Sequence, residues 1–279
     1  MKKIMIKYLL AAIFAGVALT LSAQDVKILK KNTVLLEKPV QGDVKYRLTF
    51  SAAQSGRDSI EENPTLYRHI ANASAGTYPV CRLVFLDEAG KKVSSDTRVI
   101  TIPFAEMKQH DCVFYTPRKA VKVQVLFQIP KDLTLKVTAP ELKEETAEKT
   151  VNINPKFDLG IYNYSGWSGF NDGSFRMVND ENGKTHFFSG FYAISSKYPL
   201  KDEKYLLTWE GNGYERGRVI VILLFYDAEG KKLHQLELPR LNKKHPRAEY
   251  RFKRPENAAY IAFWVYHATL AEISLVPEK

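Results

Sequence analysis

Short runs in which apolar and polar residues alternate occur along the whole chain, and long stretches with helical periodicity are scarce. In 247–253, Arg-Ala-Glu-Tyr-Arg-Phe-Lys, the even-numbered side chains are apolar and the odd-numbered ones are charged, which predicts a half-buried β-strand. Residues 121–127 alternate similarly, whereas 219–225 is apolar throughout and predicts a strand covered on both sides. The pattern therefore predicts an all-β protein.

Strand-like runs recur at short intervals, which is typical of antiparallel sandwiches. We expect strands near residues 26–30, 33–37, 44–50, 79–86, 97–103, 111–115, 120–128, 133–138, 157–163, 174–178, 185–195, 204–210, 217–226, 232–237, 247–253, 259–266 and 270–276.

One sequence block occurs twice. Residues 83–93, LVFLDEAGKKV, recur at 223–233 as LLFYDAEGKKL, and the Asp and Gly of each block predict a hairpin turn. Further matches in the same order predict a duplicated unit of roughly a hundred residues. The sequence thus predicts two antiparallel β-sandwich (jelly-roll) domains in tandem. The further matches are 46–50 with 205–209, 114–117 with 252–255 and 120–127 with 258–265.

We expect four parts along the chain. These are a signal peptide at 1–23, a first β-sandwich domain at 24–140, a charged linker at 141–152 and a second β-sandwich domain at 153–279. The linker is expected because 139–152 is rich in Glu and Lys and almost lacks large apolar residues.

The first residues have the layout of a secretory signal. A basic start with three lysines precedes the mostly apolar run 8–21 and the small residues Ser22 and Ala23. The apolar run is shorter than the roughly 20 residues of a membrane-spanning helix. We therefore expect an exported bacterial protein, secreted or periplasmic, with no transmembrane helix after signal cleavage.

The chain is basic. Cleavage after Ala23 would remove three Lys and no acidic residue, which lowers the formal net charge from +10 to +7. A basic surface favours acidic partners, but no nucleic-acid recognition motif is present, so nucleic acid is not an expected partner.

Both cysteines, Cys81 and Cys112, fall in the first repeat, at positions that correspond to Val221 and Tyr250 of the second. These are inward positions of two strands, so a disulfide within the domain is conceivable in an exported protein. The alternative is a pair of buried thiols that behave as small apolar side chains.

No arrangement of residues indicates catalysis. The six histidines are scattered, and no zinc-type spacing occurs. The segment 166–169 lacks the glycine spacing of a nucleophile elbow. We expect a protein that is not an enzyme, with a polysaccharide lyase or hydrolase as a less favoured alternative.

The strand and turn at 221–231, followed by the aromatic strand and Pro-Glu-Asn-Ala-Ala of 250–263, resemble the galactose-binding-like jelly-roll superfamily. Within it, the chain is similar to the non-catalytic carbohydrate-binding modules of bacterial polysaccharide-degrading enzymes. The resemblance implies carbohydrate as ligand. Members of this superfamily often hold a structural calcium beside a late acidic pair, but Glu272 stands alone here and Lys136 lies at the corresponding place, so no cofactor is expected.

Sugar rings stack their C–H faces on aromatic side chains, while their hydroxyls bind polar groups at the rim. The segment 157–192 has ten aromatic residues, more than twice the 12% average of the chain. Its glycine-flanked loop predicts exposed rings with polar neighbours, and the alternative is that the rings belong to the core. The candidate ligand-binding residues are Tyr162, Tyr164, Trp167, Asn171, Asp172 and Arg176.

A second candidate surface is basic. Arg247 and Arg251 lie on the charged side of the predicted strand 247–253, which would suit an anionic polysaccharide. The alternative is an edge strand that positive charge protects from aggregation. Together these features predict an exported, non-catalytic, lectin-like protein. A structural or protein-interaction module of the cell envelope is the competing interpretation.

Overall fold

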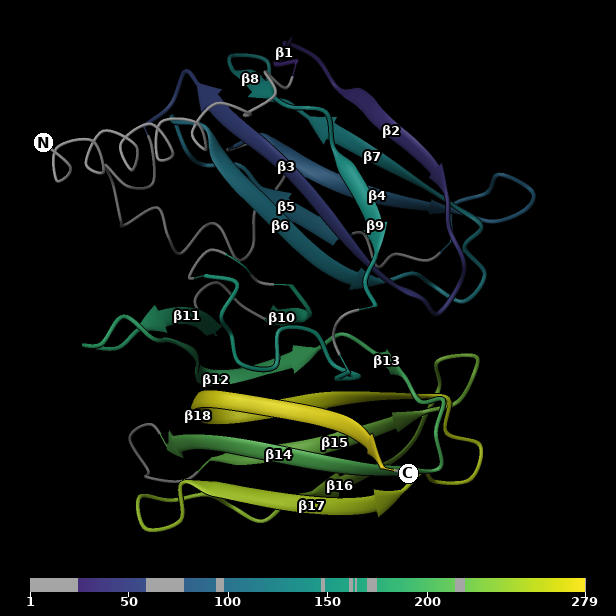
Figure 1. Cartoon of the computed structure of the whole chain (residues 1–279), viewed down its shortest axis with the longest axis vertical. Helices are drawn as coiled ribbons and strands as arrows, with labels where there is room; N and C mark the ends of the chain where they lie inside the picture. Colours follow the sequence, from purple (N-terminus) through teal and green to yellow (C-terminus); the bar gives the residue numbers. More distant parts are fainter. Residues whose placement is uncertain are drawn as a thin grey trace, which may run out of the picture.

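The computed structural model describes residues 25–58, 78–93, 98–146, 149–160, 163, 165–169, 175–213 and 219–278, so the expected signal peptide lies outside the described residues. These residues form two β-sandwiches, one above the other in Figure 1. Every strand pairing is antiparallel, which confirms the all-β sandwich fold expected from the sequence.

Two sheets build the first sandwich. In the first sheet the strand order is β1-β8-β3-β6, with β9 also paired to β3, and in the second sheet it is β2-β7-β4-β5. The strands are β1 (Lys27–Leu29), β2 (Thr33–Pro39), β3 (Lys45–Ser55), β4 (Val80–Leu86), β5 (Arg98–Thr101), β6 (Lys108–Tyr115), β7 (Lys122–Gln128), β8 (Thr134–Val137) and β9 (Glu141–Glu144).

The second sandwich is one continuous nine-stranded sheet that folds over on itself. Its central path is β10-β12-β18-β14-β17, with β11 on β12, β13 and β15 on β18, and β16 on β15. The strands are β10 (Trp167–Gly169), β11 (Phe175–Asn179), β12 (Thr185–Ser195), β13 (Tyr198–Pro199), β14 (Lys204–Gly213), β15 (Ile220–Tyr226), β16 (Lys232–Glu237), β17 (Arg247–Lys253) and β18 (Tyr260–Glu278).

Strand β18 belongs to both layers of the second sandwich. Residues 260–266 pair with β15, and residues 268–278 pair with β14. Between the two parts, His267 has a φ of +45°, in the left-handed region that few side chains adopt. Two strands were expected here, at 259–266 and 270–276. The structure joins them into one strand with a bend at His267.

The two sandwiches have the same strand order, in agreement with a duplicated unit. In the second sandwich, β14 lies between β17 and the end of β18, as β3 lies between β6 and β8 in the first. The start of β18 lies between β12 and β15, as β7 lies between β2 and β4. The matched blocks of sequence therefore occupy matching strands.

The two described ends of the segment expected as a charged linker, 141–152, belong to the two sandwiches. Strand β9 pairs with β3, with Leu142 buried in the first core. Asn152 is buried against β18, where its amide donates to the carbonyl of Ile273 and accepts from the N–H of Leu275. The expectation of a solvated linker is wrong at these positions, because Leu142 is buried in the first sandwich and Asn152 in the second.

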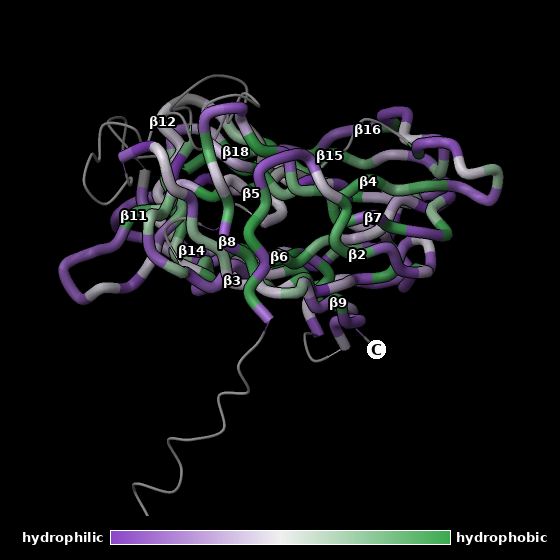
Figure 2. Tube along the Cα trace, turned by 90° about the horizontal axis from the view of Figure 1, so that it is seen from above, coloured by the Kyte–Doolittle hydropathy of each residue, from purple (hydrophilic) through white to green (hydrophobic). Residues whose placement is uncertain are grey.

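Each sandwich has its own hydrophobic core, and the strands carry most of the hydrophobic stretches in Figure 2. The cores meet at the junction between the sandwiches, where Val113 of β6 packs in the core of the second sandwich. The Tyr115 ring is 6.2 Å from that of Tyr198, and the Tyr115 hydroxyl donates to the carbonyl of Val151. The junction is therefore packed as well as hydrogen-bonded.

Cys81 of β4 and Cys112 of β6 are buried thiols in opposite sheets of the first sandwich. The expected disulfide between them is therefore wrong, and the alternative of two buried thiols holds. Phenylalanines pack between the sheets near them, with ring centroids 5.7 Å apart for Phe85 and Phe114. Packed sheets lie about 10 Å apart, more than the Cα separation of about 4.4–6.8 Å that a disulfide needs. Burial raises the pKa of the Cys81 thiol well above its ordinary value.

Candidate functional site

Trp167, expected as an exposed ring, is buried in the second core. Its side chain is only 5% exposed, and its ring centroid is 4.3 Å from that of Phe187 and 6.2 Å from that of Phe157. The expectation that Trp167 stacks on a sugar is wrong because the ring fills space between the two layers. The other loop candidates, Tyr162, Tyr164, Asn171 and Asp172, lie outside the described residues and stay predictions.

Arg176 is exposed on β11, as expected for a ligand-binding side chain. Its guanidinium carbon lies 4.9 Å from the centroid of the Phe188 ring on the neighbouring strand β12. This cation–π contact accounts for the position of Arg176 without a ligand.

The basic side chains of β17 are exposed, but they are paired with acids. Arg251 binds Glu278 at 2.9 Å, and Arg247 lies 3.6 Å from Glu210. Between the two arginines stands Glu249, 4.0 Å from Arg251. The expected basic row is therefore a surface of mixed charge, which weakens the case for an anionic polysaccharide at Arg247 and Arg251.

Three other aromatic side chains form a cluster on the outer side of the second sandwich. Tyr192 lies on β12, and Trp264 and Tyr266 lie two residues apart on β18. The ring centroids of Trp264 and Tyr266 are 5.1 Å apart, and each is 5.8 Å from that of Tyr192. We call these three residues the aromatic face.

Strand alternation explains why these rings point outward. The odd-numbered residues 261, 263 and 265 of β18 are buried in the second core, so their even-numbered neighbours project from the opposite side of the sheet. Tyr266 lies directly opposite Tyr192 of β12 in the register of the sheet, so the two side chains are close neighbours on the same side.

An apolar bed surrounds the rings. Trp264 lies between Ile194 of β12 and Ile222 of β15, and Ile220 lies beside Tyr266. All of these side chains are partly exposed. Burial is the main cause that raises the pKa of Tyr266, so its hydroxyl stays neutral at physiological pH. The surface can therefore bind through apolar contact and neutral hydroxyls.

The same place in the first sandwich has no aromatic residue. There Leu126 of β7 lies between Val34 and Arg82, as Trp264 lies between its two isoleucines. Gln128 occupies the position of Tyr266, and it accepts a hydrogen bond from the Arg82 side chain. Because the first sandwich folds with aliphatic and polar residues here, the fold itself does not require the rings of the second.

Sequence reasoning missed this site. Tyr192 ends the aromatic segment 157–192, whereas Trp264 and Tyr266 stand in an apolar run that resembles a strand covered on both sides. A position-by-position comparison of the two repeats would have found them, because it sets Trp264 against Leu126 and Tyr266 against Gln128.

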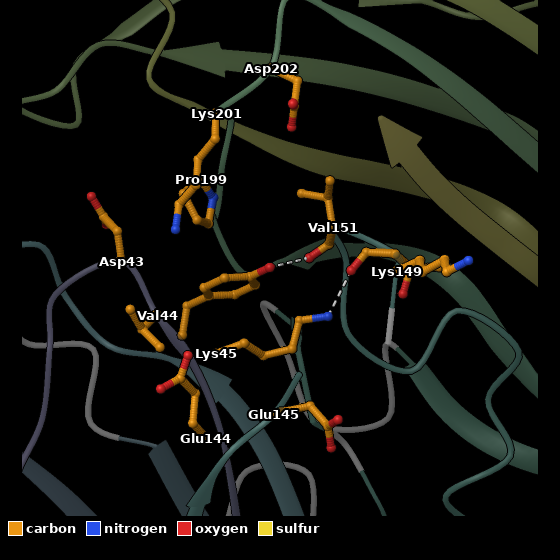
Figure 3. A pocket seen from close by; sticks show the side chains of 12 residues that line it. Asp43, Val44, Lys45, Glu144, Glu145, Lys149, Val151, Pro199, Lys201 and Asp202 are labelled. Carbon is orange, nitrogen blue, oxygen red and sulfur yellow. Dashed lines mark hydrogen bonds between the residues drawn. The ribbon is translucent and has the colours of Figure 1, made fainter. Parts of the chain in front are cut away.

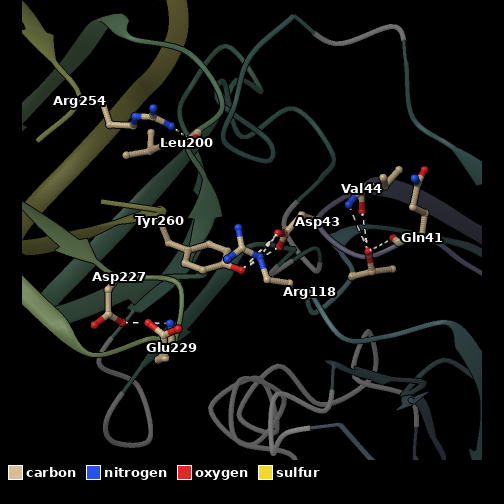
Figure 4. A network of polar contacts seen from close by, with 10 residues as sticks. Gln41, Asp43, Val44, Arg118, Leu200, Asp227, Glu229, Arg254 and Tyr260 are labelled. Carbon is tan, nitrogen blue, oxygen red and sulfur yellow. Dashed lines mark hydrogen bonds and ion pairs between the residues drawn. The ribbon is translucent and has the colours of Figure 1, made fainter. Parts of the chain in front are cut away.

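A polar cluster joins the first sandwich to the start of β18 (Figure 4). The Tyr260 hydroxyl donates to both carboxylate oxygens of Asp43, at 3.0 and 3.3 Å, and Arg118 Nε donates to the same carboxylate at 3.0 Å. The Arg118 guanidinium also lies 5.6 Å from the centroid of the Tyr260 ring. Burial and the nearby Asp43 carboxylate raise the pKa of Tyr260 to about 12.

A polar cleft of about 250 Å³ lies beside this cluster, between the sandwiches (Figure 3). Lys45 is buried in it, where its Nζ donates to the carbonyl of Thr150 and lies 5.6 Å from the centroid of the Tyr115 ring. Two of its carboxylates also bind protein groups: Asp43 accepts from Tyr260 and Arg118, and Glu145 accepts from Arg47. The cleft therefore serves the contact between the sandwiches. Its charged lining residues are Asp43, Lys45, Glu144, Glu145, Lys149, Lys201 and Asp202.

Within the described part of the chain, no three His, Cys, Asp or Glu side chains gather where they could hold a metal ion. The same part of the chain contains no helix long and apolar enough to cross a membrane.

No protein-family model matches the chain, and no curated protein sequence is significantly similar to it. Among solved structures, it is similar to the CBM22-1–CBM22-2 tandem domain of Xyn10C from Paenibacillus barcinonensis, with 8% identity, a TM-score of 0.38 and 92% of each chain covered. Tandem CBM51 modules of a family 98 glycoside hydrolase from Streptococcus pneumoniae are 10% identical, with a TM-score of 0.27, and cover 88% of this chain and 83% of theirs.

A fucolectin from striped bass (Morone saxatilis) serum is 13% identical, with a TM-score of 0.23, and covers 90% of this chain and 84% of its own.

Proposed function

We propose that the chain is an exported, non-catalytic protein that binds carbohydrate through the aromatic face of its second sandwich. One observation carries the proposal: Tyr192, Trp264 and Tyr266 cluster on the outer side of a sheet, whereas Leu126 and Gln128 stand at the positions of Trp264 and Tyr266 in the first sandwich. The basic start and apolar run of residues 1–23 support export.

The chemistry of the aromatic face suits a neutral glycan. Aromatic rings on an apolar bed stack against the C–H faces of sugars, and neutral tyrosine hydroxyls can exchange hydrogen bonds with sugar hydroxyls. The rings and the isoleucines beside them carry no charge. Since Arg247 and Arg251 are paired with acids, the described surface favours a neutral ligand over an anionic one.

The same composition supports a binding role without catalysis. Glycoside hydrolysis ordinarily needs two carboxyl groups that flank the scissile bond. The side chains that form the aromatic face and its bed are rings and isoleucines, which provide no carboxyl group. A ligand held there is stacked and not cleaved.

A glycan array with the mature protein, followed by calorimetric titration of the best ligand, tests the proposal. We expect Trp264→Ala to weaken binding by about 1–3 kcal/mol, the scale for loss of a stacked aromatic side chain. Leu126→Ala, at the equivalent place in the first sandwich, is the matched control and should leave the affinity unchanged.

Equal affinity of the wild type and a folded Trp264→Ala variant would refute the role of the aromatic face. A stable protein that binds no glycan on the array would refute carbohydrate binding altogether. The latter outcome would favour the protein-interaction module, since exposed apolar patches also mark protein interfaces.

A further inference from the structure

The outer side of the second sandwich continues from the aromatic face to the first sandwich. Along β18, the outward positions run from Tyr266 and Trp264 to Tyr260, and between them Ala262 is covered by its surroundings and buried, as is Leu224 beside it. Tyr226 of β15 lies directly beside Tyr260 in the sheet. A second pair of rings therefore stands at the junction end of the surface that carries the aromatic face.

The first sandwich supplies polar groups at this end. Arg118 lies over the Tyr260 ring, and its side chain is 51% exposed although its Nε is bound to Asp43. Only one of the several N–H donors of a guanidinium is used by that bond. On the second sandwich, Lys197 Nζ lies 4.2 Å from the centroid of the Tyr226 ring. Rings and charged hydrogen-bonding groups thus meet at the junction.

We propose that the carbohydrate site is shared by the two sandwiches. A glycan stacked on Trp264 and Tyr266 extends along β18, and its far end donates to Asp43 and accepts from Arg118. This inference rests on the proposed function and adds that the first sandwich contributes to affinity and to selection of chain length.

The span of the surface sets the length requirement. Trp264 and Tyr260 are four residues apart on an extended strand, which corresponds to about 13 Å. A disaccharide centred on Trp264 falls short of Arg118, whereas a hexasaccharide reaches it. Long chains should therefore bind more tightly than short ones, and the difference should depend on the first sandwich.

The repeat itself does not produce such a site twice. The position of Tyr260 is occupied by Lys122 in the first sandwich, and the position of Arg118 by Glu256 in the second. The junction pairs a ring from one sandwich with a guanidinium from the other. The shared site is a property of the full chain, and it is lost if either sandwich is studied alone.

The test compares disaccharides and hexasaccharides of the cello-, xylo- and chito-series by calorimetric titration of the full mature chain. We expect Arg118→Ala to weaken hexasaccharide binding by about tenfold, as for loss of a charged hydrogen bond, and to leave disaccharide binding unchanged. Lys119→Ala, an exposed neighbour, should change neither affinity.

Arg118→Lys keeps the charge but not the planar donor group, so it should restore only part of the hexasaccharide affinity. The two variants also distinguish a lost contact from a loosened junction. If the junction were loosened, the loss of hexasaccharide affinity in each variant would follow the fall in its unfolding temperature. Equal hexasaccharide affinities of Arg118→Ala and the wild type would overturn the shared site while leaving the proposed function intact. The shared site would also be overturned if Trp264→Ala alone, among these variants, lost binding to both ligand lengths.

Discussion

His110 gives the first sandwich a measurable sensitivity to acid. Its ring is stacked on Phe50 with centroids 5.0 Å apart, and its Nε2 is buried with no hydrogen-bond partner among the described residues. Burial lowers the pKa of His110 from 6.5 to about 4, because the charged imidazolium would lose its hydration. The folded protein therefore holds His110 neutral where the unfolded chain already binds a proton.

The magnitude follows from linkage between protonation and folding. Above the unfolded pKa near 6.5, both states are neutral at this site, and the full stability is present. As pH falls from 6.5 to about 4, His110 is protonated in the unfolded chain but stays neutral in the folded protein. The free energy of unfolding therefore falls by about 1.4 kcal/mol per pH unit. We expect a loss of about 3 kcal/mol between pH 7 and pH 4 from His110 alone.

The assay is urea unfolding at constant ionic strength between pH 7 and pH 4, for the wild type and His110→Phe. Phe keeps an aromatic ring against Phe50 and cannot titrate. Carboxylates titrate equally in both proteins, so the difference between the two stability curves isolates His110. The gap should grow by about 3 kcal/mol toward pH 4. Parallel curves over this range, with His110→Leu giving the same result, would refute the reasoning.

Two further predictions concern the segments that sequence analysis interpreted differently. Asn152→Ala should lower the free energy of unfolding by about 1–3 kcal/mol, since it leaves the buried backbone groups of Ile273 and Leu275 without partners. Asn152→Asp should lose at least as much in the same denaturation experiment, because it sets a buried carboxylate oxygen against the carbonyl of Ile273. Alkylation of the unreduced, unfolded protein should modify both Cys81 and Cys112, and a mass that shows neither modified would mean that a disulfide closes the sheets locally.

Much of the fold could be predicted because strand periodicity is local. The charged and apolar alternation of 247–253 became β17, and the apolar run at 219–225 became most of β15. The pairing of β9 with β3 could not be predicted, because Leu142 alone gives too short an apolar signal among charged neighbours. Its burial depends on which distant strand it meets.

The candidate site was less predictable for a related reason. The aromatic density of 157–192 pointed to rings, but density does not distinguish a buried ring such as Trp167 from a partly exposed one such as Tyr192. Which side of a strand faces water is decided by the opposing sheet. Only the contrast between repeats, with Trp264 against Leu126, carries that information in the sequence.

The single strand β18 also determines where the chain tolerates change. In the first sandwich, β7 and β8 are separated by the turn 129–133, whose exposed tip at Lys131 and Asp132 can accept a new loop or a pair of new termini. In the second sandwich, the same place is the bend at His267, where strand β18 passes from one layer to the other without a break. The turn 129–133 and the bend at His267 are equivalent points of the duplicated architecture, but only the first can accept an insertion. We therefore expect the two halves to differ in length at the first point and not at the second.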